Sequence, residues 1–184
     1  MTLEALLVSL LAWGIFPLWL AAGGADWLCH RRSRIEETSG TRESWLHVLA
    51  FAEIALPTIA ALFLRLNALM LVVAGVAVLT HMATSLLDTS YSQPRRHISP
   101  LEQQVHSYLE MLPLFAIAIV LVLHAEEWRD PVWRFVARES PLPPAAVAAT
   151  LLGLLAGLGM IAEELWRCAR RASCASARDL RGAT

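Results

Sequence analysis

Three segments of the chain repeat an acidic residue that is followed four positions later by a histidine. Residues four apart lie on one face of an α-helix, so each pair can direct a carboxylate and an imidazole toward one point. Divalent metal ions bind neutral imidazole and ionised carboxylate at about 2.0–2.2 Å. The spacing therefore predicts a metal site built from several helices. The three pairs are Asp26–His30, Glu43–His47 and Glu102–His106.

Further ionisable residues fall on the same helix faces. His81 and Asp88 are seven apart, and Glu110 follows His106 by four positions. Helical bundles that hold two iron ions use carboxylates and histidines projecting inward from facing helices. By analogy we expect two divalent metal ions. Mixed imidazole and carboxylate donors suit iron, which we expect here, and also manganese or zinc. The expected ligands are Asp26, His30, Glu43, His47, His81, Asp88, His106 and Glu110, with Glu53, His97 and Glu102 as further candidates.

The composition indicates that these residues belong to a membrane protein. Hydrophobic residues make up 57% of the chain and charged residues 17%, against about 45–50% and 25% in soluble domains. A helix needs roughly 20 apolar residues to cross a bilayer. We predict an all-α transmembrane bundle of five helices in one domain, residues 1–171, and a disordered basic tail, residues 172–184. The five apolar stretches are approximately Leu3–Ala25, Trp45–Leu64, Ala68–Leu87, Val105–His124 and Pro143–Trp166.

The arginines indicate how the bundle is oriented. Most of them follow the first, third and fifth stretches, so they gather on one side of the membrane together with five of the six histidines. Because cytoplasmic loops are rich in arginine and lysine, this distribution predicts an outer N-terminus and a cytoplasmic C-terminus. We expect the membrane to be the bacterial inner membrane.

Several charged residues on that side have two interpretations. Arg31, Arg95 and Arg96 are expected either to bind a substrate headgroup or carboxylate or only to fix the topology. Glu36, Glu37, Glu163 and Glu164 are expected to pair with arginines in solvent. Glu53 lies inside an apolar stretch, where an unpartnered charge is costly. All these residues are expected in the cytoplasmic half of the bundle, which also holds the predicted metal site.

The last apolar stretch contains glycines four positions apart, Gly153 and Gly157. This spacing leaves a groove that a second helix can enter closely. The partner is either another helix of the same bundle or a second copy of the chain in a homodimer.

The spacing of acid and histidine at the ends of membrane helices resembles the membrane-bound non-haem di-metal oxygenases, a class that includes fatty-acid hydroxylases, desaturases and alkane monooxygenases. The resemblance implies a cytoplasmic-side metal site that hydroxylates or desaturates a lipid-like substrate with help from an electron donor. The chain lacks the paired-histidine boxes of that class, so carboxylates would have to take their place. The segments that carry the resemblance are Asp26-Trp27-Leu28-Cys29-His30, Glu43-Ser44-Trp45-Leu46-His47 and Glu102-Gln103-Gln104-Val105-His106.

Two other functions remain open at this point. A single zinc ion with an activated water would make the protein a lipid hydrolase or amidase. A transporter or an accessory subunit of a membrane complex could instead use Glu53 and His81 to relay protons. The expected partners are membrane lipid and a hydrophobic substrate, and the sequence contains no glycine-rich nucleotide loop and predicts no nucleic-acid partner.

Overall fold

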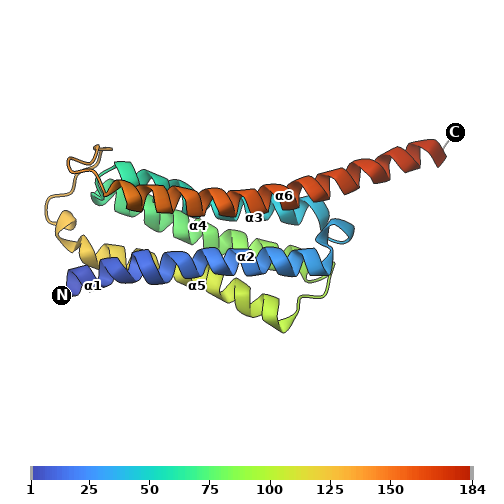
Figure 1. The fold of residues 1–184 in the computed structure, drawn as a ribbon, viewed down its shortest axis with the longest axis horizontal. Coiled ribbons are helices and arrows are strands. Elements are labelled where there is room, and N and C mark those ends of the chain that lie inside the picture. Colours follow the sequence, from blue (N-terminus) through green and yellow to red (C-terminus); the bar gives the residue numbers. More distant parts are fainter. Residues whose placement is uncertain (1, 183–184) are drawn as a thin grey trace.

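A computed structural model describes the backbone of residues 2–182 and the side chains of residues 2–174. Long helices run side by side, and all their connections are short except the one between α5 and α6, residues 124–143 (Figure 1). The first long helix, Leu3–Ser33, is continuous but has three parts. These are α1 (Leu3–Ser9), the π-helical turn η1 (Leu10–Ile15) and α2 (Phe16–Ser33). The others are α3 (Gly40–Phe63), α4 (Ala68–Ser92), α5 (Pro100–Leu123) and α6 (Pro144–Gly182).

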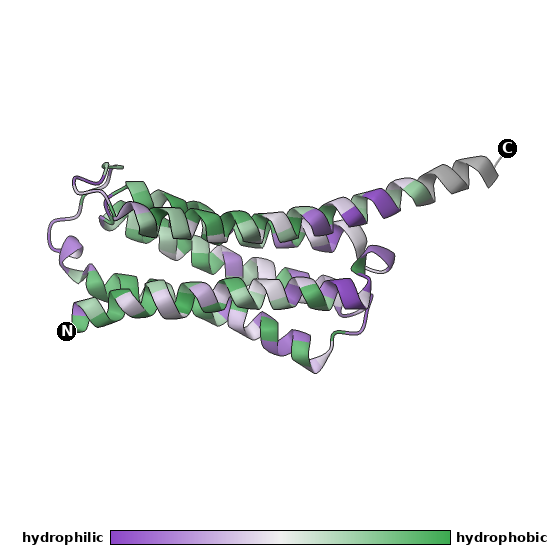
Figure 2. Cartoon of the chain, in the orientation of Figure 1, coloured by the Kyte–Doolittle hydropathy of each residue, from purple (hydrophilic) through white to green (hydrophobic). Residues whose placement is uncertain are grey.

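The fold confirms the prediction of an all-α bundle with five membrane-length helices. Each of the five helices contains a segment long and apolar enough to cross a membrane. Figure 2 shows hydrophobic residues along the middle of the bundle and hydrophilic ones toward its ends. Within residues 2–182 the only other regular elements are the short 3-10 helices η2 (Ile35–Glu37) and η3 (Ala125–Trp128) and one β-bridge between Leu64 and Ala137.

The helices continue beyond the predicted apolar stretches, and always at the same end of the bundle. The first stretch was expected to end at Ala25, yet α2 continues to Ser33. Likewise α5 begins at Pro100, where the Ser99 hydroxyl accepts a hydrogen bond from the Glu102 amide at 3.2 Å. Such N-caps fix the start of a helix. The extra turns carry five of the eleven candidate ligands, Asp26, His30, Glu43, Asp88 and Glu102.

The helices form a closed ring. Helix α2 packs against α5, α5 against α4, α4 against α3, α3 against α6, and α6 against α2. Each helix therefore turns one face toward a shared interior. Helix α6 extends past the rest of the bundle (Figure 1). It reaches Gly182, which lies inside the segment expected to be a disordered tail. Residues 183–184 and the side chains after Cys174 lie outside the described residues. The disordered tail therefore stays a prediction.

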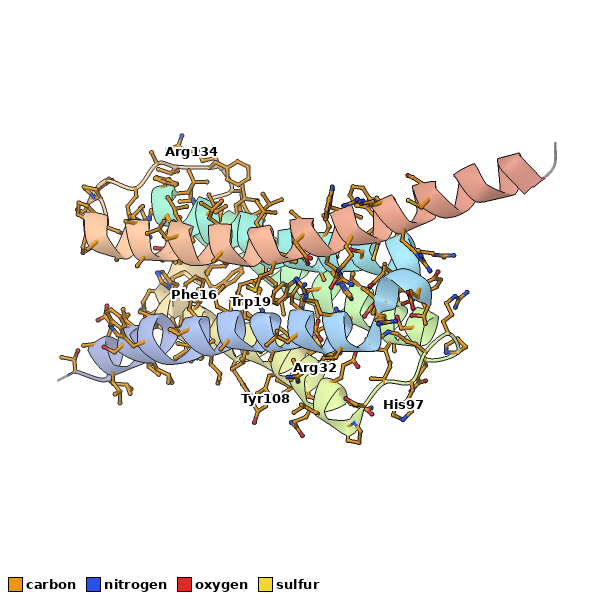
Figure 3. All side chains as sticks on the ribbon, turned by 45° about the vertical axis from the view of Figure 1, so that its right-hand side comes forward. Phe16, Trp19, Arg32, His97, Tyr108 and Arg134 are labelled. Carbon is orange, nitrogen blue, oxygen red and sulfur yellow. The ribbon has the colours of Figure 1, made fainter. Side chains whose placement is uncertain are left out.

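One end of the ring is closed by the connection between α5 and α6. Its backbone pairs with the α3–α4 turn, where the Arg65 amide donates to the Val136 carbonyl at 2.9 Å. The Asn67 side chain donates to the Arg134 carbonyl at 2.8 Å and accepts from the Met70 amide, which starts α4. Figure 3 shows Arg134 at this end and Arg32 and His97 at the other.

The glycines of α6 face neighbouring helices of the same chain. A Cβ atom at Gly153 would lie 2.6 Å from a methyl carbon of Leu20, and one at Gly157 would lie 2.9 Å from the ring of Phe51. Close approach of this kind needs glycine. The groove is therefore filled by α2 and α3. A homodimer stays a prediction, and it would need another surface.

The apolar core lies between the two ends of the ring. Its centre is formed by Trp19, Ala55, Leu112 and Leu154. The Trp19 and Phe51 rings stack with centroids 5.9 Å apart. This core separates the loop-covered end from the end that holds the candidate ligands.

Candidate metal centre

All five long helices send ionisable side chains into the ring at one level, just beyond the apolar core. We call this group the polar cluster. Most of its members are buried, and the side chains of His30, Glu43 and Glu102 are at most 2% exposed. The polar cluster consists of Asp26 and His30 from α2, Glu43 and His47 from α3, Asp88 from α4, Arg96 from the α4–α5 connection, Glu102 and His106 from α5, and Glu164 from α6.

Glu164 joins two of the histidines through one carboxylate. Its Oε1 lies 2.7 Å from Nδ1 of His47, and its Oε2 lies 2.9 Å from Nδ1 of His30. The Ser44 hydroxyl donates to the same carboxylate at 3.1 Å. The two imidazoles stack with centroids 4.5 Å apart and planes only 6° apart. Because an ionised carboxylate only accepts hydrogen bonds, each Nδ1 carries a proton, and in the neutral form of each imidazole Nε2 is a free electron-pair donor.

The free Nε2 atoms face carboxylate oxygens at distances too long for good hydrogen bonds. Nε2 of His30 lies 3.3 Å from Oε1 of Glu102 and 3.6 Å from Oδ1 of Asp26. Nε2 of His30 and Oδ1 of Asp26 are buried without a hydrogen-bond partner, whereas Oε1 of Glu102 lies 2.6 Å from the Arg96 guanidinium. Two ligands that bind one ion at about 2.0–2.1 Å with a tetrahedral angle lie about 3.4 Å apart. The spacing therefore fits atoms that share a metal ion.

A second group with the same spacing lies beside the first. Oδ2 of Asp88 is 3.4 Å from Nε2 of His47 and 3.4 Å from Nε2 of His106. Nδ1 of His106 lies 3.2 Å from the backbone carbonyl of Glu102 and can donate to it, which leaves Nε2 free. Two histidines and one carboxylate with open positions form the ligand set typical of non-haem iron(II) sites.

The charges in the polar cluster are unbalanced without cations. Arg96 is the one permanent cation, and its guanidinium lies 2.5 Å from Glu43 and 2.6 Å from Glu102. Burial opposes the charge on Arg96, but the hydrogen bonds to these two carboxylates outweigh burial and raise its pKa above the ordinary value. With neutral imidazoles, the five carboxylates still carry four negative charges in excess of Arg96. Two divalent ions would neutralise that excess, and protons on the imidazoles of His30, His47 and His106 would offset three of the four charges.

Comparison with models of known protein families, with curated proteins and with solved structures gives no match. The interpretation of the site therefore rests on its own geometry.

The paired spacing in the sequence brings its members to one level of the bundle, but their roles as ligands stay a prediction. Asp26 and His30 lie in one group of donors that could share an ion, and Glu43 and His47 lie in another. Glu43 also pairs with Arg96, while His47 faces Asp88. Glu102 faces His30 and Arg96, while His106 faces Asp26 and Asp88, because five helices share the interior.

Three expected ligands lie away from the polar cluster. His81, Glu53 and Glu110 lie closer to the apolar core, together with Thr84 and Ser85; we call these five residues the His81 cluster. The Thr84 hydroxyl donates to Glu53 at 2.9 Å, and the Ser85 hydroxyl donates to Glu110 at 2.5 Å. These carboxylates therefore have partners within the chain.

His81 is held between two backbone carbonyls. Its Nδ1 lies 3.0 Å from the oxygen of Ala50, and its Nε2 lies 3.2 Å from the oxygen of Leu109. The Leu109 carbonyl would normally accept from the amide of residue 113, but Pro113 has no N–H. In the tautomer that carries its proton on Nε2, His81 supplies the missing donor. The ring therefore has a structural task that needs no metal.

The arginines expected at a substrate headgroup have different surroundings. Arg96 is buried and paired inside the polar cluster, and its place at a substrate headgroup stays a prediction. Arg95 lies over the Tyr91 ring at 3.8 Å, and Arg31 pairs with Glu163 at 3.0 Å near the surface. His97 is exposed and lines an open cavity of about 490 Å³ beside Arg96, away from the other histidines.

Glu164 is the functional residue that the sequence analysis missed. Glu163 indeed pairs with Arg31, and Glu36 pairs with Arg167. Glu164, however, is only 2% exposed, so its assignment to a solvent-exposed ion pair was wrong. The available signal was its helical phase, since Glu164 lies on the same face as Gly157, seven positions earlier, which packs inward.

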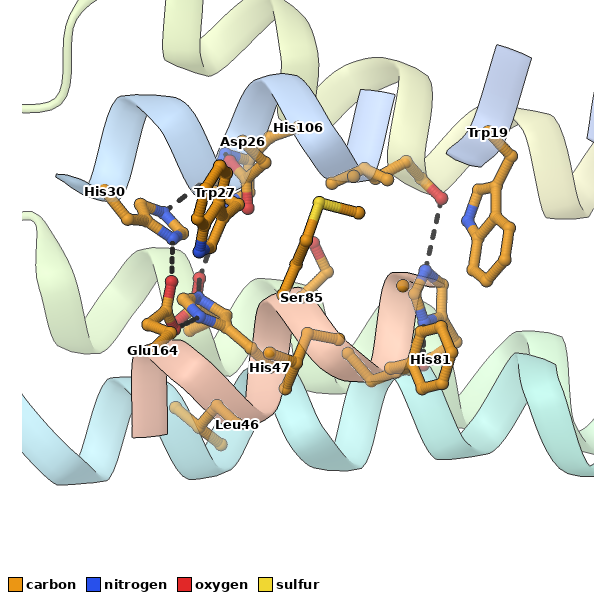
Figure 4. A pocket seen from close by; sticks show the side chains of 18 of the residues that line it. Trp19, Asp26, Trp27, His30, Leu46, His47, His81, Ser85, His106 and Glu164 are labelled. Atoms are coloured by element: carbon orange, nitrogen blue, oxygen red, sulfur yellow. Dashed lines mark hydrogen bonds and ion pairs between the residues drawn. The ribbon is translucent and has the colours of Figure 1, made fainter. Parts of the chain in front are cut away.

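A cavity of about 100 Å³ adjoins the polar cluster and reaches into the apolar core (Figure 4). All five long helices contribute to its wall. Figure 4 shows His30, His47 and Glu164 at one side of the cavity and Trp19 and His81 at the other. The cluster is therefore open to an apolar space inside the bundle.

Proposed function

We propose that this protein is an integral membrane metalloenzyme that holds two divalent metal ions, preferably iron, and oxidises a lipid-like substrate. The observation that carries the proposal is the Glu164 carboxylate shared by two imidazoles. Histidines that bind metals almost always donate their second ring N–H to a carboxylate or carbonyl, which fixes the ring and raises its basicity. Here one residue does this for His30 and His47 at once.

Among the described residues, the donors that lie close enough to share an ion form two groups with His30 in common. Asp26, His30 and His106 would hold one ion, and His30, Glu43 and His47 the other. Arg96, which contacts both Glu43 and Glu102, would balance part of the remaining negative charge. The ligands are nitrogen and oxygen atoms only, and the second set favours iron(II).

The proposed reaction is an oxygen-dependent oxidation of an unactivated carbon. In hydroxylation, a C–H bond and one O₂ molecule, with two electrons and two protons, give a C–OH bond and one water. In desaturation, the substrate gives up two hydrogens, and the same O₂, electrons and protons give two waters. The two electrons come from an external one-electron carrier. The protein residues hold the ions, exclude water and position the substrate.

The proposed orientation follows the arginines. The end of the bundle with the polar cluster faces the cytoplasm of a bacterial cell, and the N-terminus faces outward. A soluble electron donor would then approach the same end of the bundle that carries the metal centre.

Elemental analysis tests the proposal directly. The purified protein, loaded with iron(II) and passed through a desalting column, should retain about two metal ions per chain. The His47→Ala variant should retain one or fewer. Less than one iron per chain in the wild-type protein, with no retention of manganese or zinc either, would contradict the proposed metal centre.

A zinc-dependent hydrolase is the second candidate, because two histidines and one carboxylate also leave a position for an activated water on zinc. The two functions differ in their need for oxygen. Turnover of a lipid ester or amide under strict anaerobiosis, with zinc as the retained metal, would replace oxidation by hydrolysis.

A further inference from the structure

The cavity beside the polar cluster has two chemically different ends. Near the cluster its wall contains ligand side chains such as His30 and Asp88. Away from the cluster its wall is made of Trp19, Leu20 and Phe51. Trp19 precedes Asp26 by seven residues on the same helix, which corresponds to about 10 Å along its axis. The cavity therefore extends from the candidate ligands toward the middle of the bundle.

The dimensions of the cavity select the shape of an occupant. A cavity of about 150 Å³ takes up benzene, and this one is smaller, about 100 Å³. Its wall nevertheless extends over about 10 Å along α2, from Asp26 to Trp19. A narrow and elongated apolar space fits a short stretch of linear hydrocarbon chain, and it is too small for a fused ring system.

We propose that this cavity binds the end of a linear alkyl or acyl chain and holds it with one carbon beside the polar cluster. The inference rests on the proposed function for the fate of that carbon, but the binding of the chain depends only on the cavity. The apolar wall would bury several methylene groups, each of which is stabilised by leaving water or detergent headgroups. The class of substrate is therefore a single-chain amphiphile or hydrocarbon.

Gly23 provides a way to block the cavity without disturbing the packing around it. It lines the cavity from α2, and a Cβ atom added there meets no other atom within 4 Å. A leucine side chain at this position would occupy the space assigned to the chain. Gly75 on α4 also has free space around an added Cβ atom but does not line the cavity, so Gly75→Leu is the matched control.

Contact quenching of tryptophan fluorescence measures the binding. The probe is 10-bromodecan-1-ol, whose terminal bromine quenches a tryptophan that it touches, added to the full-length protein in detergent micelles. Wild-type protein and Gly75→Leu should show a saturable quenching component. The double variant Trp19→Phe/Trp27→Phe should lose that component, and Gly23→Leu should raise the half-saturating concentration on the order of tenfold or more. A brominated sterol should give no saturable component.

The same samples are analysed for metal, which separates the two proposals. Retained metal with equal saturable quenching in wild type and Gly23→Leu would overturn chain binding in the cavity and leave the metal centre standing. Saturable quenching that Gly23→Leu abolishes, in protein that retains no metal, would support the chain site and contradict the proposed oxidation. Trp27 also lines the cavity, so a saturable signal that the double variant Trp19→Phe/Trp27→Phe retains would place the probe elsewhere and overturn the inference.

Discussion

The polar cluster and the His81 cluster contain the same kinds of residues but differ in how well their polar atoms are satisfied. In the His81 cluster both ring nitrogens face carbonyl oxygens, and Glu53 and Glu110 accept hydrogen bonds from hydroxyl groups, although Oε2 of Glu53 is buried without a hydrogen-bond partner. In the polar cluster the Nε2 atoms of His30 and His47 are buried without a hydrogen-bond partner. A buried histidine in a membrane helix is therefore a ligand candidate when one nitrogen is oriented and the other is free, and a structural residue when both are occupied.

The largest difference is expected from removing one histidine in each cluster. His47→Ala should lower the retained metal by at least half, since it deletes a ligand and one partner of Glu164. His81→Ala should leave the metal content unchanged. Elemental analysis after iron loading measures both variants. Equal metal loss in the two variants would show that the two clusters are one site.

Glu164→Gln should weaken metal binding by about 10- to 100-fold, the usual effect of removing a carboxylate that orients metal-binding histidines. An amide has one oxygen and one NH₂ group, so it cannot accept from both Nδ1–H groups. Chelator competition measures the affinity. The matched control is Glu163→Gln, one residue away, where the carboxylate pairs with Arg31 near the surface and the affinity should stay the same.

A double-mutant cycle tests the structural task of His81. His81→Ala should lower the free energy of unfolding by about 1–3 kcal/mol, because the Leu109 carbonyl is left unsatisfied. Pro113→Ala restores the backbone N–H that this carbonyl lacks. In that background the cost of His81→Ala should be smaller by about 1 kcal/mol. Unfolding of metal-free protein in detergent measures all four forms, and strictly additive effects would refute the role.

The smallest effects are expected from two serines. Ser44→Ala removes a donor to Glu164 in the polar cluster and should lower metal affinity only a few-fold. Ser85→Ala removes the donor to Glu110 and should cost about 1 kcal/mol of stability with no change in metal affinity. A change in metal affinity for Ser85→Ala would extend the metal centre toward the core.

The five membrane helices were predictable because apolar length is a property of each segment alone. The helical turns beyond those segments were not predictable from apolar length. Helix α2, for example, continues to Ser33 through polar and charged residues, some of which pair with residues of neighbouring helices. The i, i+4 pairs likewise identified His30, His47 and His106 as inward-facing. Their partners depend on the order of helices in the ring, which no local pattern contains.

The separation of His81 from the other histidines was also beyond the sequence analysis. It depends on the hydrogen bond between His81 and the Leu109 carbonyl, which joins α4 to α5. Pro113 alone indicates that some carbonyl is left free, but not which side chain reaches it. Glu164 was missed for a related reason, because its neighbour Glu163 points outward and the pair resembles a charged helix end.

The position of Glu164 on the last helix has a consequence for biosynthesis. A nascent chain emerges N-terminus first, so the histidines of α2 and α3 enter the membrane before the carboxylate that orients them has been translated. Until α6 inserts, the four-helix intermediate contains acidic and imidazole groups without their final partner. Loading of the ions would then follow completion of the polypeptide, and a truncated product ending before residue 164 would be a target for membrane proteolysis rather than a partly active enzyme.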